Sequence, residues 1–211
     1  MHYLLLIIAF LFQTAQSKAI GSLERAIKHT RGLMHSTLDN SLTIGHAKSI
    51  ETEELVKLIN DAYAVEIGDT GVAFKKDGVN RFRSAAAIEE FGKSVSSDRC
   101  LLLRNGQEIL ACLVYEVNEE DDGGCSVFFG PFAAKTKGKG HGMLLYEEFQ
   151  RMAKEVLMAK AIKLYVVNHR TELIKLYSKL GFVVEENTAT YPNPEVLSRP
   201  SHFIIMKKTL S

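Results

Sequence analysis

The sequence predicts an α+β fold with a single mixed, mostly antiparallel β-sheet flanked by helices, in the order βααβββαβαββ. Three observations predict this fold. Apolar runs of strand length recur from Ser41 onward. Between these runs, apolar residues recur at helical spacing. Two connections carry glycine turns typical of β-hairpins, and hairpins argue against an all-parallel sheet.

The composition is that of one soluble globular domain. The chain has 211 residues, of which 46% are hydrophobic and 24% are charged, and this length is enough to bury a proper core. A net charge of +1 argues against a strongly basic nucleic-acid-binding protein. Cys100, Cys112 and Cys125 are odd in number and lack CxxC spacing, which argues against a disulfide framework and a zinc cluster. We expect three free thiols, at least two of them on strands.

The first 40 residues differ in kind from the rest. An apolar run precedes Lys18, the first Lys, Arg, Asp or Glu of the chain, and it is shorter than the roughly 20 residues that span a bilayer. Residues 1–17, with a small-x-small site at 15–17, fit a signal peptide, and residues 18–40 fit a linker or a loosely docked helix. We therefore expect one domain at 41–211 and entry into the secretory pathway or secretion. The alternative is an apolar extension that is never cleaved, or a wrongly assigned start, in a cytoplasmic protein.

The domain opens with a strand and two helices. Residues 41–47 alternate between apolar and polar as a half-buried strand does. Residues 49–67 follow with Ser49 as the expected N-cap, acidic residues in the first turn and apolar residues at helical spacing. Residues 84–95 predict a shorter second helix.

Three antiparallel strands come next. Apolar runs fill residues 99–120 and 124–134. Asn105 and Gly106 divide the first run and mark a tight hairpin turn, and the DDGG sequence at 121–124 marks a second turn. Because both turns reverse the chain directly, the three strands are expected to pair in sequence order.

The rest of the chain alternates helices and strands before two closing strands. In order, the elements are a helix ending near Met158, a strand at 161–168, a helix at 170–180, and strands at 182–189 and 201–210. Gly181 is the expected C-cap of the second helix, because glycine readily takes the left-handed conformation that ends helices.

The loop before the first of these helices is unusual. It holds alternating lysines and glycines: Lys135, Lys137, Gly138, Lys139, Gly140 and Gly142. Amides at a helix N-terminus have no intrahelical partner, and the helix dipole adds positive potential there. Glycines would let a phosphate approach those amides, so we expect an anion site, and most plausibly a phosphate site. A plain strand-to-helix turn would leave three glycines unexplained.

Two common phosphate motifs do not fit this loop. A P-loop would need Ser or Thr after Lys139, where the sequence has Gly140. The dinucleotide fingerprint G-x-G-x-x-G would need a glycine at Met143.

The loop does resemble that of a known family. The sequence KGKGHG at 137–142 is similar to the Q/R-x-x-G-x-G/A loop of the GCN5-related N-acetyltransferases (GNAT). A second stretch, 165–182, resembles the family's strand–Asn–helix segment that ends in LYEKLGF. The resemblance covers roughly residues 41–210 and includes the element order. Two departures are Lys137 in place of Gln or Arg, which keeps the charge but loses the planar fork, and Ala134 where a proline often stands.

The resemblance implies an N-acetyltransferase domain that binds acetyl-CoA between two central strands that splay apart. Backbone groups of β-strand residues would run beside pantetheine, and loop amides would hold the pyrophosphate. The residues implied in co-substrate binding are Phe132, Ala133, Lys137, Gly138, Lys139, Gly140, His141, Gly142, Met143, Asn168 and Tyr177. A backbone N–H near Phe132 would stabilise the oxyanion.

The resemblance also implies catalytic roles. Tyr177 matches a tyrosine that reaches the sulfur of CoA, and a phenol with a pKa of about 10 can protonate a leaving thiolate. Attack needs a neutral amine, often through a base and a water, and Glu116 is a candidate base. Alternative interpretations are packing for Tyr177, a strand end and helix cap for Asn168, and solvated side chains for Glu116 and His141. Cys125 is expected in the core.

The expected function is transfer of an acetyl group from acetyl-CoA to an amine by direct attack in a ternary complex. The expected partners are acetyl-CoA and an amine-bearing small molecule or peptide, with no metal, no nucleic acid and no transmembrane span. A non-catalytic acyl-CoA-binding module and a secreted interaction protein on the same fold stay open as alternatives.

Overall fold

The computed structural model describes residues 41–64, 85–96, 98–120, 123–190 and 200–211. The predictions for residues 1–40, for the helix beyond Ala64 and for the turn residues 121–122 lie outside the described residues. None of the described helices is long and apolar enough to cross a membrane.

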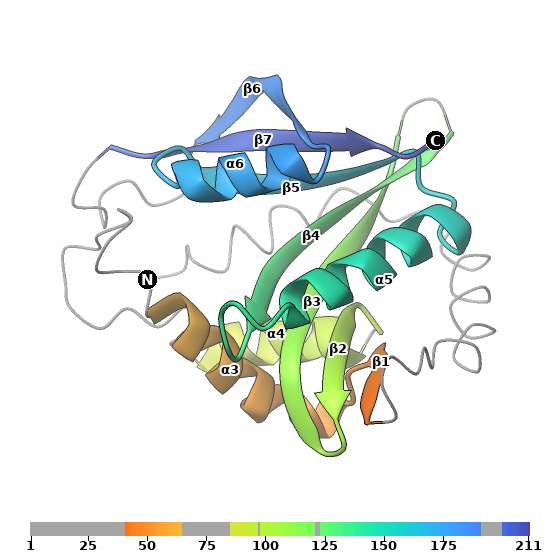
Figure 1. The fold of residues 1–211 in the computed structure, drawn as a ribbon, viewed down its shortest axis with the longest axis vertical. Coiled ribbons are helices and arrows are strands. Elements are labelled where there is room, and N and C mark those ends of the chain that lie inside the picture. The colour runs from red at the N-terminus through yellow and green to blue at the C-terminus, as the bar shows by residue number, and fades with distance from the viewer. Residues whose placement is uncertain (1–40, 65–84, 97, 121–122, 191–199) are drawn as a thin grey trace.

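The helices and strands follow the predicted order, βααβββαβαββ (Figure 1). They are β1 (Leu42–His46), the 3₁₀ helix η1 (Ser49–Glu51), α3 (Thr52–Ala64), α4 (Ala85–Ser96), β2 (Cys100–Asn105), β3 (Glu108–Glu119), β4 (Cys125–Ala134), α5 (His141–Glu155), β5 (Ala161–Val167), α6 (Thr171–Lys179), β6 (Val183–Thr190) and β7 (His202–Thr209).

All seven strands form one sheet in the order β1-β2-β3-β4-β5-β7-β6. Every neighbouring pair is antiparallel except β4 and β5, which are parallel. The prediction of a mixed, mostly antiparallel sheet is therefore confirmed. The helix α5 makes the crossover that a parallel pair requires.

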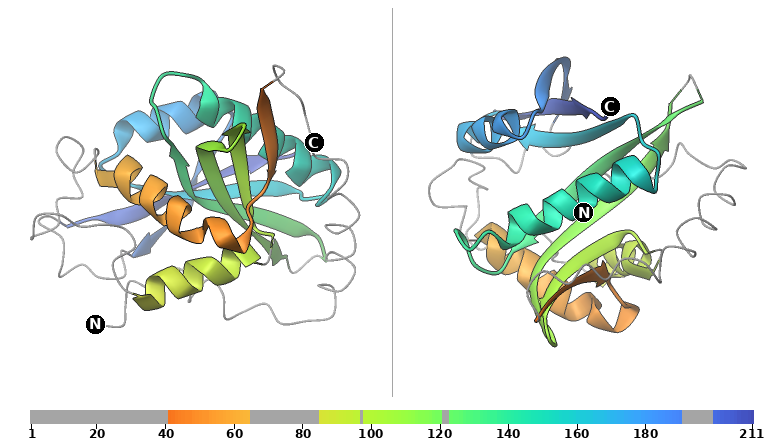
Figure 2. Two further views of the ribbon diagram at one scale, coloured as in Figure 1. Left: turned by 90° about the horizontal axis from the view of Figure 1, so that it is seen from below. Right: turned by 45° about the vertical axis from the view of Figure 1, so that its right-hand side comes forward.

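Helices cover both faces of the sheet (Figures 1 and 2). Residues of α3 and α4 form one buried cluster with alternate residues of β2 and β3, including Val114. Residues of α5 and α6 form the other cluster with the residues of β2 and β3 that point to the opposite side of the sheet, including Tyr115. We call these two sides the α3/α4 face and the α5/α6 face. Because side chains on a strand alternate between faces, each position on β3 is assigned to one of them.

The parallel pair β4–β5 is short. Its pairing comprises three residue pairs and ends with Phe128 opposite Lys163. Beyond that point β4 continues to Ala134 along β3, and β5 continues along β7, and the two strands diverge (Figure 1). An extra residue in β4, between Phe129 and Phe132, shifts its register with β3 where the divergence begins. The expected splay between two central strands is confirmed.

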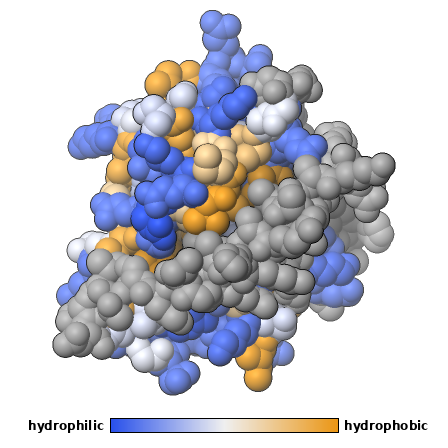
Figure 3. Space-filling model, turned by 90° about the vertical axis from the view of Figure 1, so that its right-hand side faces the viewer, coloured by the Kyte–Doolittle hydropathy of each residue, from blue (hydrophilic) through white to orange (hydrophobic). Residues whose placement is uncertain are grey.

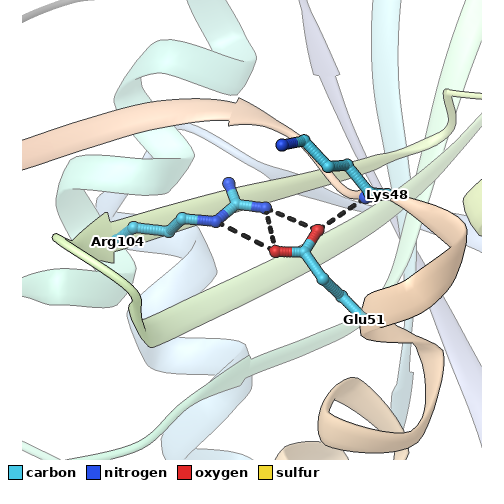
Figure 4. Close-up of polar contacts among 3 residues, drawn as sticks. All are labelled: Lys48, Glu51 and Arg104. Carbon is cyan, nitrogen blue, oxygen red and sulfur yellow. Dashed lines mark hydrogen bonds and ion pairs between the residues drawn. The ribbon is translucent and has the colours of Figure 1, made fainter.

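One local prediction was wrong. The N-cap of the first helical turn is Lys48 rather than Ser49, which is itself the first residue of η1. The Glu51 carboxylate takes over the capping, since its Oε2 accepts a hydrogen bond from the Lys48 backbone N–H at 2.6 Å. The same carboxylate accepts two bonds from Nη2 of Arg104, at 2.6 and 2.7 Å (Figure 4). This ion pair fastens the turn between β1 and α3 to β2.

The three cysteines are free thiols, and all three lie on strands. Cys100 and Cys112 are fully buried. Cys125 is half-buried against the α5/α6 cluster, with its Sγ 3.2 Å from the Leu157 carbonyl oxygen. In the coloured part of Figure 3, hydrophilic side chains surround a group of hydrophobic side chains near the centre of the view.

Candidate functional site

The glycines of the loop before α5 are required for two different structural reasons. Gly138 and Gly140 take left-handed backbone conformations, with φ of +76° and +77°, and a Cβ at either would meet no other described atom within 4 Å. Gly142 is different, because a Cβ there would lie 3.3 Å from Cζ of Phe132. The third glycine is therefore explained by the packing of α5 against β4. Among the three glycines of this loop, Gly138 and Gly140 are the two that combine a left-handed backbone with open space beside it.

The N-terminus of α5 presents backbone donors. Gly140 is its N-cap, and the first helical hydrogen bond runs from the Leu144 N–H to the Gly140 carbonyl at 3.0 Å. The amides of His141, Gly142 and Met143 precede that bond, so helix geometry gives them no intrahelical acceptor. Together with the helix dipole, they form the kind of end that attracts anions.

The interpretation of His141 as a solvated side chain was wrong. The residue is half-buried, and its Nδ1 is buried without a hydrogen-bond partner among the described residues. Because it is the first residue of α5, its ring lies beside the open end of the helix.

The three lysines of the loop do not act alike. Lys135 forms an ion pair with Glu108 on β3, at 2.6 Å between Nζ and Oε1. Lys137 and Lys139 are exposed in the loop. Burial raises the pKa of Glu172, in the first turn of α6. Hydrogen bonds from Arg170 and from its own backbone N–H, together with the charges of Arg170 and Lys137, outweigh burial and leave that pKa below its ordinary value. The loop and the start of α6 are therefore near enough to interact.

Phe132 and Ala133 lie on the part of β4 that has left β5. Phe132 is half-buried in the α5/α6 cluster, and Ala133 is buried in the other cluster. Their side chains thus pack on opposite faces of the sheet. Their backbone pairs with β3 on one side, and the β4–β5 pairing on the other side has already ended at Phe128.

Asn168 directly follows Val167, the last residue of β5, and is bonded to His202, the first residue of β7. Its N–H donates to the His202 carbonyl at 3.0 Å, and its Oδ1 accepts from the His202 N–H at 3.3 Å. The interpretation as a strand end is confirmed. It does not cap α6, whose N-cap is Arg170 without a side-chain capping bond.

Tyr177 packs across from β4. Its ring lies 6.1 Å from the ring of Phe129 and 5.7 Å from that of Phe182, both in edge-on arrangements. The side chain is half-buried on the α5/α6 face. Packing is therefore one role of Tyr177, and its role as an acid stays a prediction.

Glu116 is not a solvated strand carboxylate, and that interpretation was wrong. The residue is only 9% exposed, and its Oε2 has no hydrogen-bond partner among the described residues. Burial raises the pKa of its carboxyl to about 7, and the positive charge of Arg99 opposes this shift. Glu116 pairs with Phe128, the last residue of β4 that also pairs with β5. A buried carboxylate that can exchange a proton near neutrality thus stands where the strands diverge.

The sequence analysis missed the aromatic residues beside Glu116. The rings of Phe128 and Tyr165 lie 4.8 Å apart, and Phe203 stacks on Tyr165 at 5.7 Å. They come from β4, β5 and β7 respectively. On each strand, the aromatic residue stands between neighbours that point to the other face of the sheet, and this alternation can be seen in the sequence. Alternation within one strand does not show that three different strands bring their rings together.

No group of three or more His, Cys, Asp or Glu side chains suited to a metal ion occurs among the residues with described positions. The site therefore consists of backbone amides, lysines, aromatic rings and one buried carboxylate.

No protein-family model matches the chain, and no curated protein matches it either. Solved structures do. An acetyltransferase of the GNAT family from Streptococcus pneumoniae is 22% identical with a TM-score of 0.55, over 81% of this chain and 99% of that one. Naa50 of Arabidopsis thaliana, in complex with the bisubstrate analogue CoA-Ac-MVNAL, is 16% identical with a TM-score of 0.57, over 81% and 99%. A polyamine N-acetyltransferase of Drosophila melanogaster, which forms N-acetylagmatine, is 15% identical with a TM-score of 0.58, over 80% and 100%.

Proposed function

We propose that this chain, which has the GNAT fold, is an N-acetyltransferase that moves an acetyl group from acetyl-CoA to an amine by direct attack in a ternary complex. One observation carries the proposal. Open space beside two left-handed glycines adjoins the free amides of α5, at the side of the sheet where β4 and β5 stop pairing. A turn that only connected a strand to a helix would not need this combination of open space, free amides and diverging strands.

The residues present fit acetyl-CoA as a co-substrate. The amides at the start of α5 and the charges of Lys137 and Lys139 suit a pyrophosphate. The unpaired edge of β4 at Phe132 and Ala133 offers backbone groups to the amides of pantetheine. When bound, acetyl-CoA supplies an activated acetyl thioester.

Two side chains of this protein handle protons in the proposed reaction. Glu116 accepts a proton from the ammonium form of the acceptor, which leaves a neutral amine nitrogen for the attack. The Tyr177 hydroxyl donates a proton to the sulfur that leaves, and the second proton lost by the nitrogen passes to solvent. The proton held by Glu116 then passes through solvent to the Tyr177 phenolate, which restores both side chains. In total, the amine loses two protons, the sulfur gains one, and one proton is released.

Structural neighbours suggest the range of acceptors but do not choose among them. One neighbour was solved with a CoA–peptide analogue, and another acetylates agmatine. Both acceptors are amines, which is consistent with the proposed acyl transfer to nitrogen.

Calorimetric titration with acetyl-CoA, followed by a thiol-release assay against a panel of amines, tests the proposal. We expect binding and amine-dependent release of CoA. Binding without release for any amine would favour the non-catalytic acyl-CoA-binding module. Absence of binding would leave the alternative of an interaction protein on the same fold.

A further inference from the structure

We infer that the acceptor is an amine that is protonated at neutral pH, and that Glu116, Phe128 and Tyr165 bind its ammonium group on the α3/α4 face of the sheet. This inference rests on the proposed function and narrows it to a class of substrate.

The three side chains lie on the face opposite to α5 and α6. Glu116 stands between Tyr115 and Val117, which both pack on the α5/α6 face. By alternation, Glu116 points to the α3/α4 face, and its partner across the ladder, Phe128, points the same way. Tyr165 contacts the ring of Phe128 and therefore shares that face.

The end of the β4–β5 ladder connects the two faces. A paired sheet separates its faces, because backbone hydrogen bonds and side chains fill the space between the strands. The pairing ends at Phe128 and Lys163. A donor held by the loop of α5 and an acceptor on the α3/α4 face can therefore meet just beyond these two residues. Direct transfer in a ternary complex requires such a meeting point.

The aromatic rings suit a cation. Phe128 and Tyr165 come from the two strands that diverge, and their rings lie 4.8 Å apart at an angle of 57°. Phe203 extends the row by stacking on Tyr165. All three residues are half-buried, so part of their surface is accessible. The faces of aromatic rings are electron-rich and attract ammonium groups.

The carboxylate of Glu116 completes the site. An ionised carboxylate is costly to bury unless it is paired, and Oε2 of Glu116 has no partner among the described residues. The positive charge of Arg99 acts on Glu116, but Oε2 of Glu116 accepts no hydrogen bond from Arg99. An ammonium N–H at Oε2 would supply the missing hydrogen bond and the missing charge.

Two lysines near the aromatic row are each paired with a glutamate. Lys163 lies 2.8 Å from Glu120 and Lys207 lies 3.9 Å from Glu185, measured between Nζ and Oε1. Lys163 and Glu185 both act on Tyr165, with opposite signs. Because each pair joins one positive and one negative charge, its net charge is close to zero. Among the described residues near the aromatic row, Glu116 is therefore the carboxylate best able to attract a cationic ligand.

Binding of two amines of similar shape and different charge tests the inference. The full-length protein, saturated with CoA, is titrated with cyclohexylamine, which is protonated at neutral pH, and with aniline, which is not. We expect cyclohexylamine to bind about 10-fold more tightly or better. Tetramethylammonium, a cation that cannot be acetylated, should compete with cyclohexylamine and leave acetyl-CoA binding unchanged.

Variants assign the effect to the three side chains. Glu116→Gln should weaken cyclohexylamine binding about 10-fold or more, and Tyr165→Leu or Phe128→Leu about 3- to 30-fold. Tyr165→Phe, which keeps the ring, should restore binding relative to Tyr165→Leu. Glu119→Gln, at an exposed position of the same strand, is the matched control and should bind as the unchanged protein does.

The outcomes separate the inference from the function on which it rests. If acetyl-CoA does not bind to the unchanged protein, the proposed function fails. If acetyl-CoA binds and acetyl transfer occurs, but aniline binds as tightly as cyclohexylamine, the cationic acceptor site is overturned and the function stands. The cationic acceptor site would also be overturned if Glu116→Gln bound cyclohexylamine as tightly as the unchanged protein does and kept its acetyl-CoA affinity.

Discussion

At the scale of single residues, Glu116 is the side chain whose environment most determines what the site can do. Its carboxyl is 9% exposed, and burial raises its pKa from 4.5 to about 7 against the opposing charge of Arg99. A carboxyl with such a pKa is half-ionised near neutral pH, so it can both attract a cation and take its proton.

The raised pKa of Glu116 predicts how stability changes with pH. Between pH 4.5 and about 7, the unfolded chain has lost this proton and the folded protein still holds it. Stability therefore falls as pH rises through this window, by about 3 kcal/mol at about 1.4 kcal/mol per pKa unit. Urea denaturation at pH 5 and pH 8 measures this. Glu116→Gln should lose less stability over that interval, and equal losses in both proteins would contradict the pKa shift.

A second prediction at this scale concerns Tyr177. If its hydroxyl protonates the leaving sulfur, Tyr177→Phe should lower turnover by about 10- to 1000-fold with little change in acetyl-CoA affinity. Tyr146→Phe is the matched control, because the ring of Tyr146 also contacts Phe129 and Phe182. Steady-state kinetics with both variants decides. Equal turnover in Tyr177→Phe and the unchanged protein would make Tyr177 a packing residue.

At the scale of elements, the start of α5 and the turn before α3 have separate roles. The first offers open backbone amides beside Gly138 and Gly140. The second is held by the ion pair of Glu51 and Arg104 (Figure 4). A change in the first should affect binding, and a change in the second should affect stability.

Gly140→Asp tests the start of α5. The substitution puts a Cβ and a negative charge where the pyrophosphate would lie, so acetyl-CoA affinity should fall beyond detection by calorimetry while the fold persists. Gly106→Asp is the control, because Gly106 also has a positive φ, +57°, and open space around its Cβ, but lies in the β2–β3 turn. If Gly140→Asp bound acetyl-CoA as Gly106→Asp does, the anion-site assignment would be wrong.

Glu51→Ala tests the turn before α3. Its side chain is 18% exposed, accepts three hydrogen bonds from the Arg104 guanidinium and caps η1, so its loss should lower the free energy of unfolding by about 1–3 kcal/mol. Glu89→Ala, in an exposed pair with Lys93, should leave stability unchanged within error. Thermal and chemical denaturation of both variants is the measurement. A similar small effect in the two would show that the Glu51 pair is no stronger than a surface pair.

At the scale of the whole molecule, two layers of helices meet one sheet that opens in its middle. The loop, the unpaired edge of β4 and Tyr177 serve one side of that opening, and Glu116 with its aromatic neighbours stands on the other. In the proposed reaction, the donor and the acceptor would lie on separate faces, so that each could enter without displacing the other, as a ternary complex requires.

The sequence by itself determined the order of the elements, the hairpin at Asn105 and Gly106, and the glycine loop before α5. These features depend on short-range properties: the period of apolar residues, the conformational freedom of glycine and the free amides of a helix end. The resemblance to the GNAT loop was visible in the sequence because it too depends on a short stretch of consecutive residues.

Only the tertiary structure decided which residues meet. It showed that Gly142 serves the packing of Phe132, that Glu116 is buried, and that Phe128 and Tyr165 lie together. These contacts join residues ten or more positions apart, through strand register and the end of the β4–β5 ladder. Burial and pKa depend on all neighbours in space, and local sequence patterns carry no information about neighbours brought together from distant strands.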